Sequence, residues 1–287
     1  VLTKYGDIFY VRFDGTAEAN KDGEIQQYDW QGYYDTVRKY QPGAVIALVG
    51  PDVRWYGNEW GVVRENEWSV VPERYSIYEA IKGSDDKKKR KKEEKFERDI
   101  GSRKAIKKDS SFIWYPCEVC ISLRDRWYYH KDDEYTAKTK DKLLKLYYST
   151  VGANCALMIG VPPMKSGKFA DMDSQIMKAL GYDLKRSFAS IVSQIGTIEA
   201  SSTLSSQYDV NNLFDPDENK TWRPASDDKE PELTITLREK DMFDRVQMME
   251  HIINGQHVEE YEIFIDRVKI YKLFEKKEFT NSNGISK

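Results

Sequence analysis

The segment AVIALVGPDVRWYGNEWG, residues 44–61, decides the fold class of this chain. Its first part, residues 44–50, is a continuous apolar run of the kind found in parallel strands that are buried on both faces. The preceding run DIFYVRF, residues 7–13, is rich in β-branched and aromatic residues and also predicts a strand. Between the two, apolar residues at helical spacing from 30 to 37 predict a helix that Asp29 caps. Strand, helix and strand in this order form a βαβ unit.

The same alternation of strands and helices continues downstream. Further strands are predicted at Trp68–Val71, Phe112–Leu123 and Cys155–Val161. Further helices are predicted after Thr139 and around residues 176–184. The pattern indicates an α/β protein, built either as a barrel or as an open doubly wound sheet.

A domain boundary is expected near residue 190, where the composition changes. Beyond it Ser, Thr, Asn and Asp become frequent, and the apolar runs shorten and alternate with polar residues. The segments ELTITL (232–237) and YEIFI (261–265) predict strands of an antiparallel sandwich. Residues 1–190 are therefore expected to form an α/β domain and residues 191–287 a β-sandwich.

Charge and hydropathy argue against two broad classes of protein, general nucleic-acid binders and membrane-spanning proteins. The chain of 287 residues has a formal net charge of −3, which argues against a general nucleic-acid binder. The run Lys82–Lys108 contains KKKRKK, which is compatible with a nucleic-acid patch, but acidic residues soon dilute it, so a solvated loop is favoured. No apolar run reaches the roughly 18 residues of a membrane span, so none is predicted.

Two of the three cysteines, Cys117 and Cys120, form a C-x-x-C inside an apolar, strand-like run. Residues three apart in a strand point to opposite faces, so this pair is expected to form neither a disulfide nor a shared metal site. Structural cysteines are favoured, and no metal or organic cofactor is predicted for the chain.

Two acidic residues stand where an α/β barrel carries its chemistry, at the C-terminal ends of strands. Asp14 directly follows DIFYVRF, and Glu59 lies in the polar segment after the apolar run at 44–50. Two carboxyl groups that face one cleft are the minimum for glycoside hydrolysis. A separation of about 5 Å supports retention and one of about 6.5–9.5 Å supports inversion, and the sequence leaves this distance open.

Longer motifs connect these carboxylates to a known family. VRFDG at 11–15 is similar to the V-W-F-D-G nucleophile segment of glycoside hydrolase family 29, the α-L-fucosidases. GPDVRWYGNE at 50–59 resembles the segment that carries the acid/base glutamate in the subfamily acting on α-1,3/1,4-fucosyl linkages. Residues 114–130 and 154–163 resemble two further barrel motifs, and residues 212–224 and 243–264 resemble the discoidin-type sandwich that follows the barrel.

The resemblance implies a role for each matched residue. Asp14 would be the nucleophile and Glu59 the acid/base of a retaining α-L-fucosidase without a metal or organic cofactor. Trp127 matches the family tryptophan that packs on the fucose ring. Arg54 would bond sugar hydroxyls or position a carboxylate, with a structural salt bridge as the alternative. The residues expected to line the aglycone side are Trp55 and Trp60.

The matched motifs begin part-way along the family's barrel. The chain is therefore expected to hold the C-terminal half of a (β/α)8-type barrel and an incomplete sandwich, and to pair with the missing half or a second chain. The expected ligand is a fucosylated oligosaccharide or glycoconjugate, and the expected location is secreted, periplasmic or lysosomal. Arg12, Cys120 and Gly160 replace the family's Trp, Asp and Asn, which leaves a catalytically inactive carbohydrate-binding protein as the alternative.

Overall fold

The computed structural model describes most of the chain, in two compact units. The described residues are 1–14, 23–24, 26–64, 67–77, 99–189, 195–217, 219–240, 243–253, 257–258 and 260–274, with backbone only at 270–274. The units divide between Leu180 and Gly181, inside a helix. The sequence-based boundary near residue 190 falls just beyond that helix, at residues outside the described ranges.

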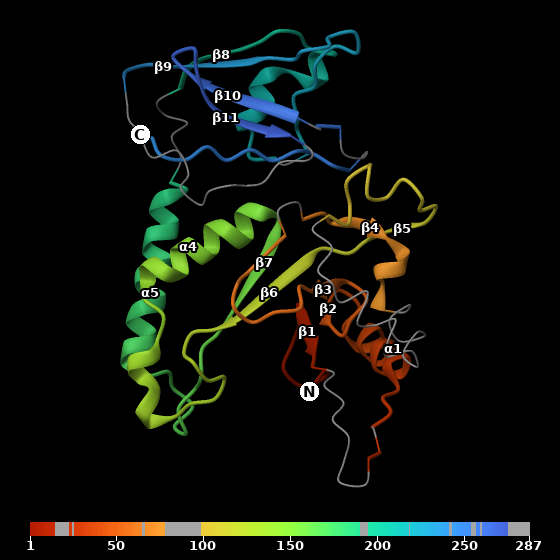
Figure 1. Ribbon diagram of the computed structural model, residues 1–287, viewed down its shortest axis with the longest axis vertical. Coiled ribbons are helices and arrows are strands. Elements are labelled where there is room, and N and C mark those ends of the chain that lie inside the picture. Colours follow the sequence, from red (N-terminus) through yellow and green to blue (C-terminus); the bar gives the residue numbers. More distant parts are fainter. Residues whose placement is uncertain are drawn as a thin grey trace. The chain divides into compact units, whose positions relative to one another are not determined.

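Unit 1 is built on a five-stranded parallel sheet, which confirms the α/β class (Figure 1). Its strands, in their order across the sheet, are β1 Tyr10–Phe13, β2 Val45–Leu48, β3 Val53–Trp55, β6 Cys117–Ser122 and β7 Cys155–Gly160. Each neighbouring pair runs parallel. Sheet order that follows chain order is typical of a (β/α)8 barrel wall, whereas a doubly wound sheet reverses its order at a switch point. The sheet is thus consistent with part of an α/β barrel.

We call the face of this sheet on which helix α1, Trp30–Tyr40, packs the outer face. This helix begins where predicted, and the Asp29 side chain accepts a hydrogen bond from the Gly32 N–H. Tyr34 and Val37 of α1 pack with the buried Ala44 and Ile46. Helix α4, Lys140–Thr150, is capped by Thr139 as predicted, and α5 spans Asp171–Ser187. The short 3₁₀ turns described in unit 1 are η1 Glu73–Tyr75, η2 Lys131–Thr136 and η3 Val151–Ala153.

The segment Phe112–Leu123 is two strands, where the sequence predicts one. Strand β5, Phe112–Trp114, pairs antiparallel with β4, Val70–Pro72, outside the parallel sheet. The break falls at Tyr115-Pro116, where proline has no N–H to donate and the Tyr115 N–H is bonded to the Ser69 carbonyl. The strand β3 is not predicted by the sequence, because its central residue is the charged Arg54.

An unusually short link joins the parallel strands β2 and β3. Residues 49–52 connect them, although a parallel crossover ordinarily takes about a dozen residues or more. Asp52 closes the link by accepting the Ile46 N–H at 2.7 Å, and its carboxylate also pairs with Arg38. A Cβ atom at Gly50 would stand 2.4 Å from the Ile46 carbonyl oxygen. The link therefore depends on glycine at this position for space.

Replacement of this glycine tests the link. We expect Gly50→Ala to lower the free energy of unfolding by about 2–4 kcal/mol, because backbone must move to admit the methyl group. Gly43→Ala is the matched control, since nothing lies within 4 Å of a Cβ there. Urea unfolding followed by circular dichroism measures both. Equal midpoints for the two variants would contradict the role given to Gly50.

Arg124, directly beyond β6, holds three segments of unit 1 together. Its side chain is fully buried and makes a two-pronged pair with Asp173 of α5, through Nε at 3.1 Å and Nη2 at 2.8 Å. Its Nη1 donates to Asp133 of η2 at 2.9 Å and to the His130 carbonyl. Buried carboxylates need such partners because an unpaired charge is costly away from water.

Removal of Arg124 is expected to be far more damaging than removal of an exposed arginine. Arg124→Met leaves Asp173 and Asp133 buried without their partner, at a cost of about 3–5 kcal/mol in unfolding free energy. Arg74→Met breaks the more exposed pair with Asp109 and is expected to cost at most about 1 kcal/mol. Chemical denaturation of both variants gives the comparison, and similar losses would refute it.

Unit 2 holds two small antiparallel sheets. Strand β8, Ile195–Ala200, pairs with β9, Leu233–Leu237, and β10, Glu260–Ile265, pairs with β11, Val268–Phe274. The turns η5, Ser206–Tyr208, and η6, Val210–Phe214, lie between β8 and β9 in the chain. The predicted strands at 232–237 and 261–265 are present, while the incomplete discoidin-like sandwich stays a prediction.

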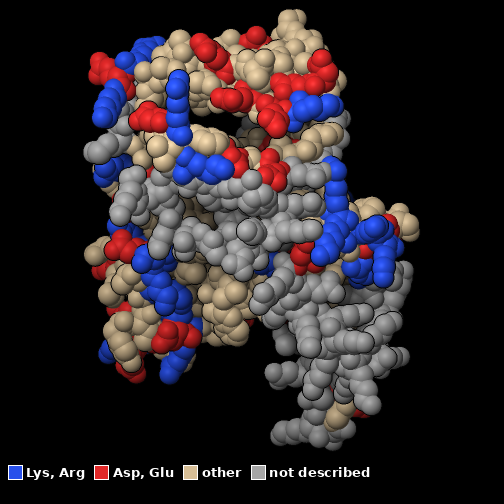
Figure 2. Space-filling view, turned by 45° about the horizontal axis from the view of Figure 1, so that its top comes forward, with Lys and Arg blue, Asp and Glu red and all other residues tan. Residues whose placement is uncertain are grey.

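The surface of the described residues carries both signs of charge. On the face shown in Figure 2, basic and acidic side chains lie intermingled. Most of the charge-rich run at 82–108, including KKKRKK, lies outside the described residues, so the predicted loop is not described there. None of the helices in the described part of the chain combines the length and apolar character that a membrane crossing needs.

Candidate active site

The face of the parallel sheet opposite α1, which we call the inner face, carries polar side chains. Side chains of directly paired residues in a parallel sheet share a face, and successive residues alternate. Ala47 pairs with Arg12 and with Val53, and two residues further along β3 Trp55 pairs with Glu118. Ile46 directly precedes Ala47 and packs toward α1, so Ala47 points to the opposite, inner face. The residues aligned with Ala47 on the neighbouring strands therefore also belong to the inner face.

Glu118 is fully buried and connects two strands that are not neighbours. Its carboxylate accepts hydrogen bonds from the Tyr10 hydroxyl and, at 3.1 Å, from Arg12 Nε, both on β1. Strands β2 and β3 lie between β1 and β6, so in a flat sheet these strands would be about 14 Å apart at roughly 4.8 Å per step. The contact therefore requires the sheet to curl toward its inner face, as a barrel wall does.

Asp14 directly follows β1, at the C-terminal end of that strand, and is exposed. Arg12, two residues earlier, directs its Nε to Glu118. The cation that the sequence places near Asp14 is thus paired with another carboxylate. The Tyr10 hydroxyl is turned to the same carboxylate, and burial raises the pKa of this phenol.

A short glycine-bounded loop presents Glu59 beyond the end of β3. Gly57 and Gly61 have φ values of 101° and 83°, a region that favours glycine. Between them Asn58 is buried, and its side chain accepts the Trp60 N–H at 3.1 Å and donates to the Val62 carbonyl at 2.9 Å. With Asn58 held inward, Glu59 and Trp60 project into solvent.

Trp127 contacts Glu59 directly. Its indole Nε1 donates a hydrogen bond to Glu59 Oε2 at 3.0 Å. The same ring lies over the end of β7, where a Cβ at Gly160 would come within 2.6 Å of it. Gly160 replaces an asparagine of the family motif. Because it has no side chain, the Trp127 indole can occupy the space above it. Two of the matched residues, from loops after β3 and β6, are therefore brought together.

Cys120 is a buried thiol on the inner face of β6. Burial on the inner face raises the pKa of its thiol, and the Arg12 cation lowers it in part. The negative charges of Glu118, Glu59 and Asp14 also act on this thiol. Asp14 and Glu59 follow β1 and β3, so both lie at the C-terminal edge of the sheet.

Arg54 lies on the outer face, away from the two carboxylates. It is buried, it forms an ion pair with Glu67, and its Nε donates to the Tyr115 carbonyl at 2.8 Å. The structure therefore shows the salt-bridge alternative for this residue. Trp55, the next residue, faces inward beside Glu118, and it is 40% exposed. Trp60 is 72% exposed on the loop of Glu59.

Glu118 and its partner Tyr10 lie on the same face as the candidate site, and the sequence prediction did not name them. A signal was available, because Glu118 is the one charged residue in the run CEVCIS, which is buried along its length. A charge in such a strand has to be paired with another group. The identity of the partners, more than a hundred residues earlier, was not readable from local pattern.

A second cluster of chemical groups lies on the outer face. Glu67, Cys117 and Cys155 are buried, and their carboxylate and thiol atoms lie within 4.8 Å of one another. Cys120 points to the inner face, so the prediction that Cys117 and Cys120 face opposite ways is confirmed. Both oxygens of Glu67 are engaged, one by Arg54 and one by Arg64.

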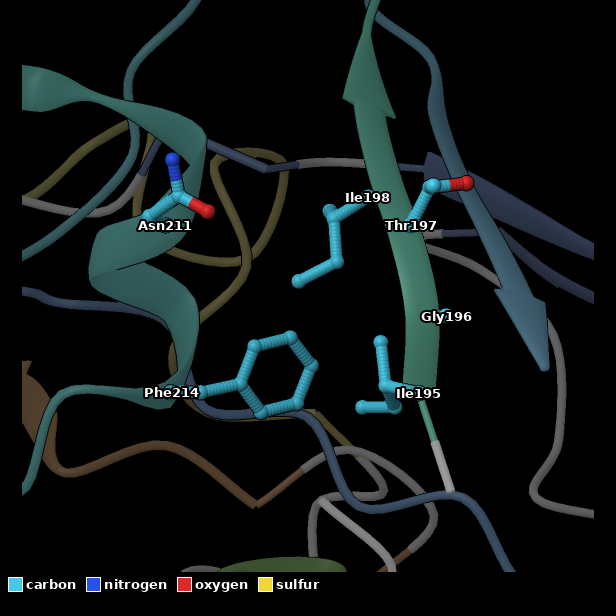
Figure 3. A pocket seen from close by; sticks show the side chains of 6 residues that line it. All are labelled: Ile195, Gly196, Thr197, Ile198, Asn211 and Phe214. Carbon is cyan, nitrogen blue, oxygen red and sulfur yellow. The ribbon is translucent and has the colours of Figure 1, made fainter. Parts of the chain in front are cut away.

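Unit 2 contains a pocket of about 440 Å³ between β8 and η6. Figure 3 shows Ile195 and Ile198 of β8 pointing toward Phe214 of η6, with Asn211 beside them. The lining residues include no acid or base, so this pocket does not offer the paired carboxylates that hydrolysis of a glycoside requires. Its lining mixes apolar side chains with the polar Thr197 and Asn211.

Residues 5–187 match the model of the α-L-fucosidase family, described as Alpha-L-fucosidase. The chain belongs to this family. The match covers β1 to α5, and it includes Asp14, Glu59 and Trp127.

Individual relatives agree with the family match. The chain is 27% identical over 268 residues to alpha-L-fucosidase 1 of Arabidopsis thaliana, which covers 92% of this chain and 48% of the relative. A Ruminococcus gnavus GH29 fucosidase solved in complex with fucose has the same fold, with a TM-score of 0.70 and 21% identity over 93% of this chain and 53% of that one. The chain thus spans about half the length of the curated relatives that it matches.

The seat of Trp127 gives a testable structural prediction. We expect Gly160→Val to displace the indole and break its hydrogen bond to Glu59, because the added side chain would occupy the ring's position. The indole N–H signal of Trp127, assigned with Trp127→Phe, should then move upfield in a ¹H–¹⁵N spectrum. Gly181→Val serves as control, since nothing lies within 4 Å of a Cβ at that position. An unmoved Trp127 signal in Gly160→Val would contradict the packing.

Proposed function

We propose that this chain supplies the catalytic carboxylates of an α-L-fucosidase, with Asp14 as the nucleophile and Glu59 as the acid/base. The observation that carries the proposal is the placement of these two family-matched acids at the same edge of one curled sheet, with Trp127 bonded to Glu59. Barrel enzymes carry their reactive groups at this edge.

The reaction is a double displacement with retention. Asp14 attacks the anomeric carbon of α-L-fucose while Glu59 protonates the departing glycosidic oxygen, which leaves a fucosyl ester on Asp14. Glu59 then takes a proton from water, which attacks the same carbon and releases fucose. Both side chains are exposed, so a sugar can approach each of them. The half-exposed Trp127 ring offers an apolar surface for the C–H face of the sugar.

The preferred linkages are α-1,3 and α-1,4. This part of the proposal rests on GPDVRWYGNE at 50–59, which resembles the acid/base segment of the subfamily with that specificity. Trp55 on the inner face and Trp60 on the Glu59 loop are exposed aromatic rings near the acid/base. Such rings stack on sugar residues beyond the scissile bond.

The whole enzyme contains more than this chain describes. Because the chain spans about half the length of its curated relatives, the remaining pocket residues belong to a preceding barrel segment or to a second chain. Unit 2 is an incomplete discoidin-like sandwich in this proposal. The substrate is a fucosylated oligosaccharide or glycoconjugate, and the location is secreted, periplasmic or lysosomal, as the family resemblance implies.

Carboxamide variants test the two roles. Asp14→Asn is expected to lower kcat on an aryl fucoside by at least about 1,000-fold, because no covalent intermediate can form. Glu59→Gln is expected to lower turnover of a Lewis-type trisaccharide by about 100- to 10,000-fold, because an alcohol leaving group needs its proton. Glu73→Gln, an exposed acid that contacts Ser111 beside β4, should keep full activity. Undiminished turnover by Asp14→Asn would eliminate it as nucleophile.

The stereochemical course separates the two mechanisms that paired carboxylates allow. Proton NMR of an early reaction mixture should show α-L-fucose as the first product, which then mutarotates. β-L-Fucose as the first product would mean inversion and would remove the nucleophilic role of Asp14.

The assay is run on this chain and on a chain extended to the full length of the relatives. Activity of the extended chain, abolished by Asp14→Asn, supports the proposal. Binding of the trisaccharide by a folded extended chain, with no fucose released, would favour the carbohydrate-binding alternative.

A further inference from the structure

Three outer-face residues form a row across β3, β6 and β7. Arg54 pairs with Cys117, and Cys117 pairs with Cys155, as direct neighbours in the parallel ladder. Cys117 is 1% exposed and Cys155 is 4% exposed. Neighbouring strands lie about 4.8 Å apart, which is within the roughly 4.4–6.8 Å that separates the Cα atoms of disulfide-bonded cysteines. The backbone therefore already holds this pair at bridging distance.

The thiols of this pair lie close together, and each also donates to a backbone carbonyl, Cys117 to Glu118 and Cys155 to Ala153. Their sulfur atoms lie within 4.8 Å, and a hydrogen bond with Cys117 is the main reason that the pKa of the Cys155 thiol is raised, with burial second. The Arg54 cation acts in the opposite direction and favours the thiolate of Cys155. A thiolate formed at one of these cysteines has the free thiol of the other on the adjacent strand.

A metal-binding role is a less favoured interpretation of the cluster of Glu67, Cys117 and Cys155. Two thiols and a carboxylate are suitable zinc ligands, but Glu67 already accepts Arg54 on one oxygen and Arg64 on the other. Ligation by Glu67 would leave a buried guanidinium without its partner and place a dication beside two cations. These contacts favour chemistry between the two sulfurs over ligation of a metal.

We propose that Cys117 and Cys155 are a redox-active pair that closes to a disulfide between β6 and β7 when a peroxide is the oxidant. One cysteine, as its thiolate, attacks hydrogen peroxide, the O–O bond breaks, and a sulfenic acid and water form once a proton is taken up. The second thiol displaces the sulfenic oxygen as water, which forms the S–S bond. Two S–H bonds are lost, two electrons reduce the peroxide, and two water molecules leave.

Thiol counting after peroxide treatment tests the pair. The reduced chain is exposed to hydrogen peroxide, quenched in acid, unfolded in denaturant with a chelator, and alkylated. We expect alkylation at all three cysteines before oxidation and at Cys120 alone afterwards, with a tryptic cross-link between the peptides of Cys117 and Cys155. Dithiothreitol should restore all three sites.

Single replacements give the matched controls. Cys120→Ser should still lose both remaining thiols, because Cys120 faces the other side of the sheet. Cys117→Ser should keep Cys155 out of any intramolecular cross-link. Three alkylated cysteines after oxidation of the wild-type chain, or a cross-link that includes Cys120, would overturn the proposal. Protection by a bound metal would also appear as three alkylated cysteines, because the chelator and denaturant release the ion.

Discussion

Glu118 is fully buried on the inner face, and a carboxylate in that position has to be neutralised by groups that reach it from elsewhere. Its partners, Tyr10 and Arg12, come from β1, with two strands between them and β6. Meeting this requirement curls the sheet, and the curl brings the ends of β1, β3 and β6 toward one another. The loops that carry Asp14, Glu59 and Trp127 start from those ends. One electrostatic requirement inside the sheet therefore determines which loops can share a site.

Local pattern was enough to predict the elements that depend on nearby residues. The cap at Asp29, the helix that follows it and the apolar strand β2 are all set by neighbours in the chain. The strand β3 was missed because Arg54 interrupts its apolar pattern, and its partners Glu67 and the Tyr115 carbonyl are visible only in three dimensions. The single strand expected at 112–123 was wrong for a related reason, because Pro116 separates pairing with β4 from pairing with β3.

The candidate site shows the same division. Motifs located Asp14, Glu59 and Trp127, and the structure brings the last two into contact. The motif could not predict on which face of the sheet the Arg54 side chain lies, because a shift of one residue in a strand moves a side chain to the other face. Pairing with Cys117 determines the face on which Arg54 lies, and no local sequence rule predicts that pairing. The replacements at positions 12 and 160 likewise gained meaning only from their contacts with Glu118 and the Trp127 ring.

The hydrogen bond from Trp127 distinguishes the two carboxylate oxygens of Glu59. An indole N–H can donate but has no lone pair in the ring plane with which to accept. As long as Trp127 Nε1 donates to Oε2, one acceptor position of that oxygen is filled, while no described residue is shown to occupy Oε1. The aromatic ring thus makes two chemically equivalent oxygens unequal. Because that ring rests on the bare backbone of Gly160, a residue without a side chain determines which oxygen of Glu59 the indole engages.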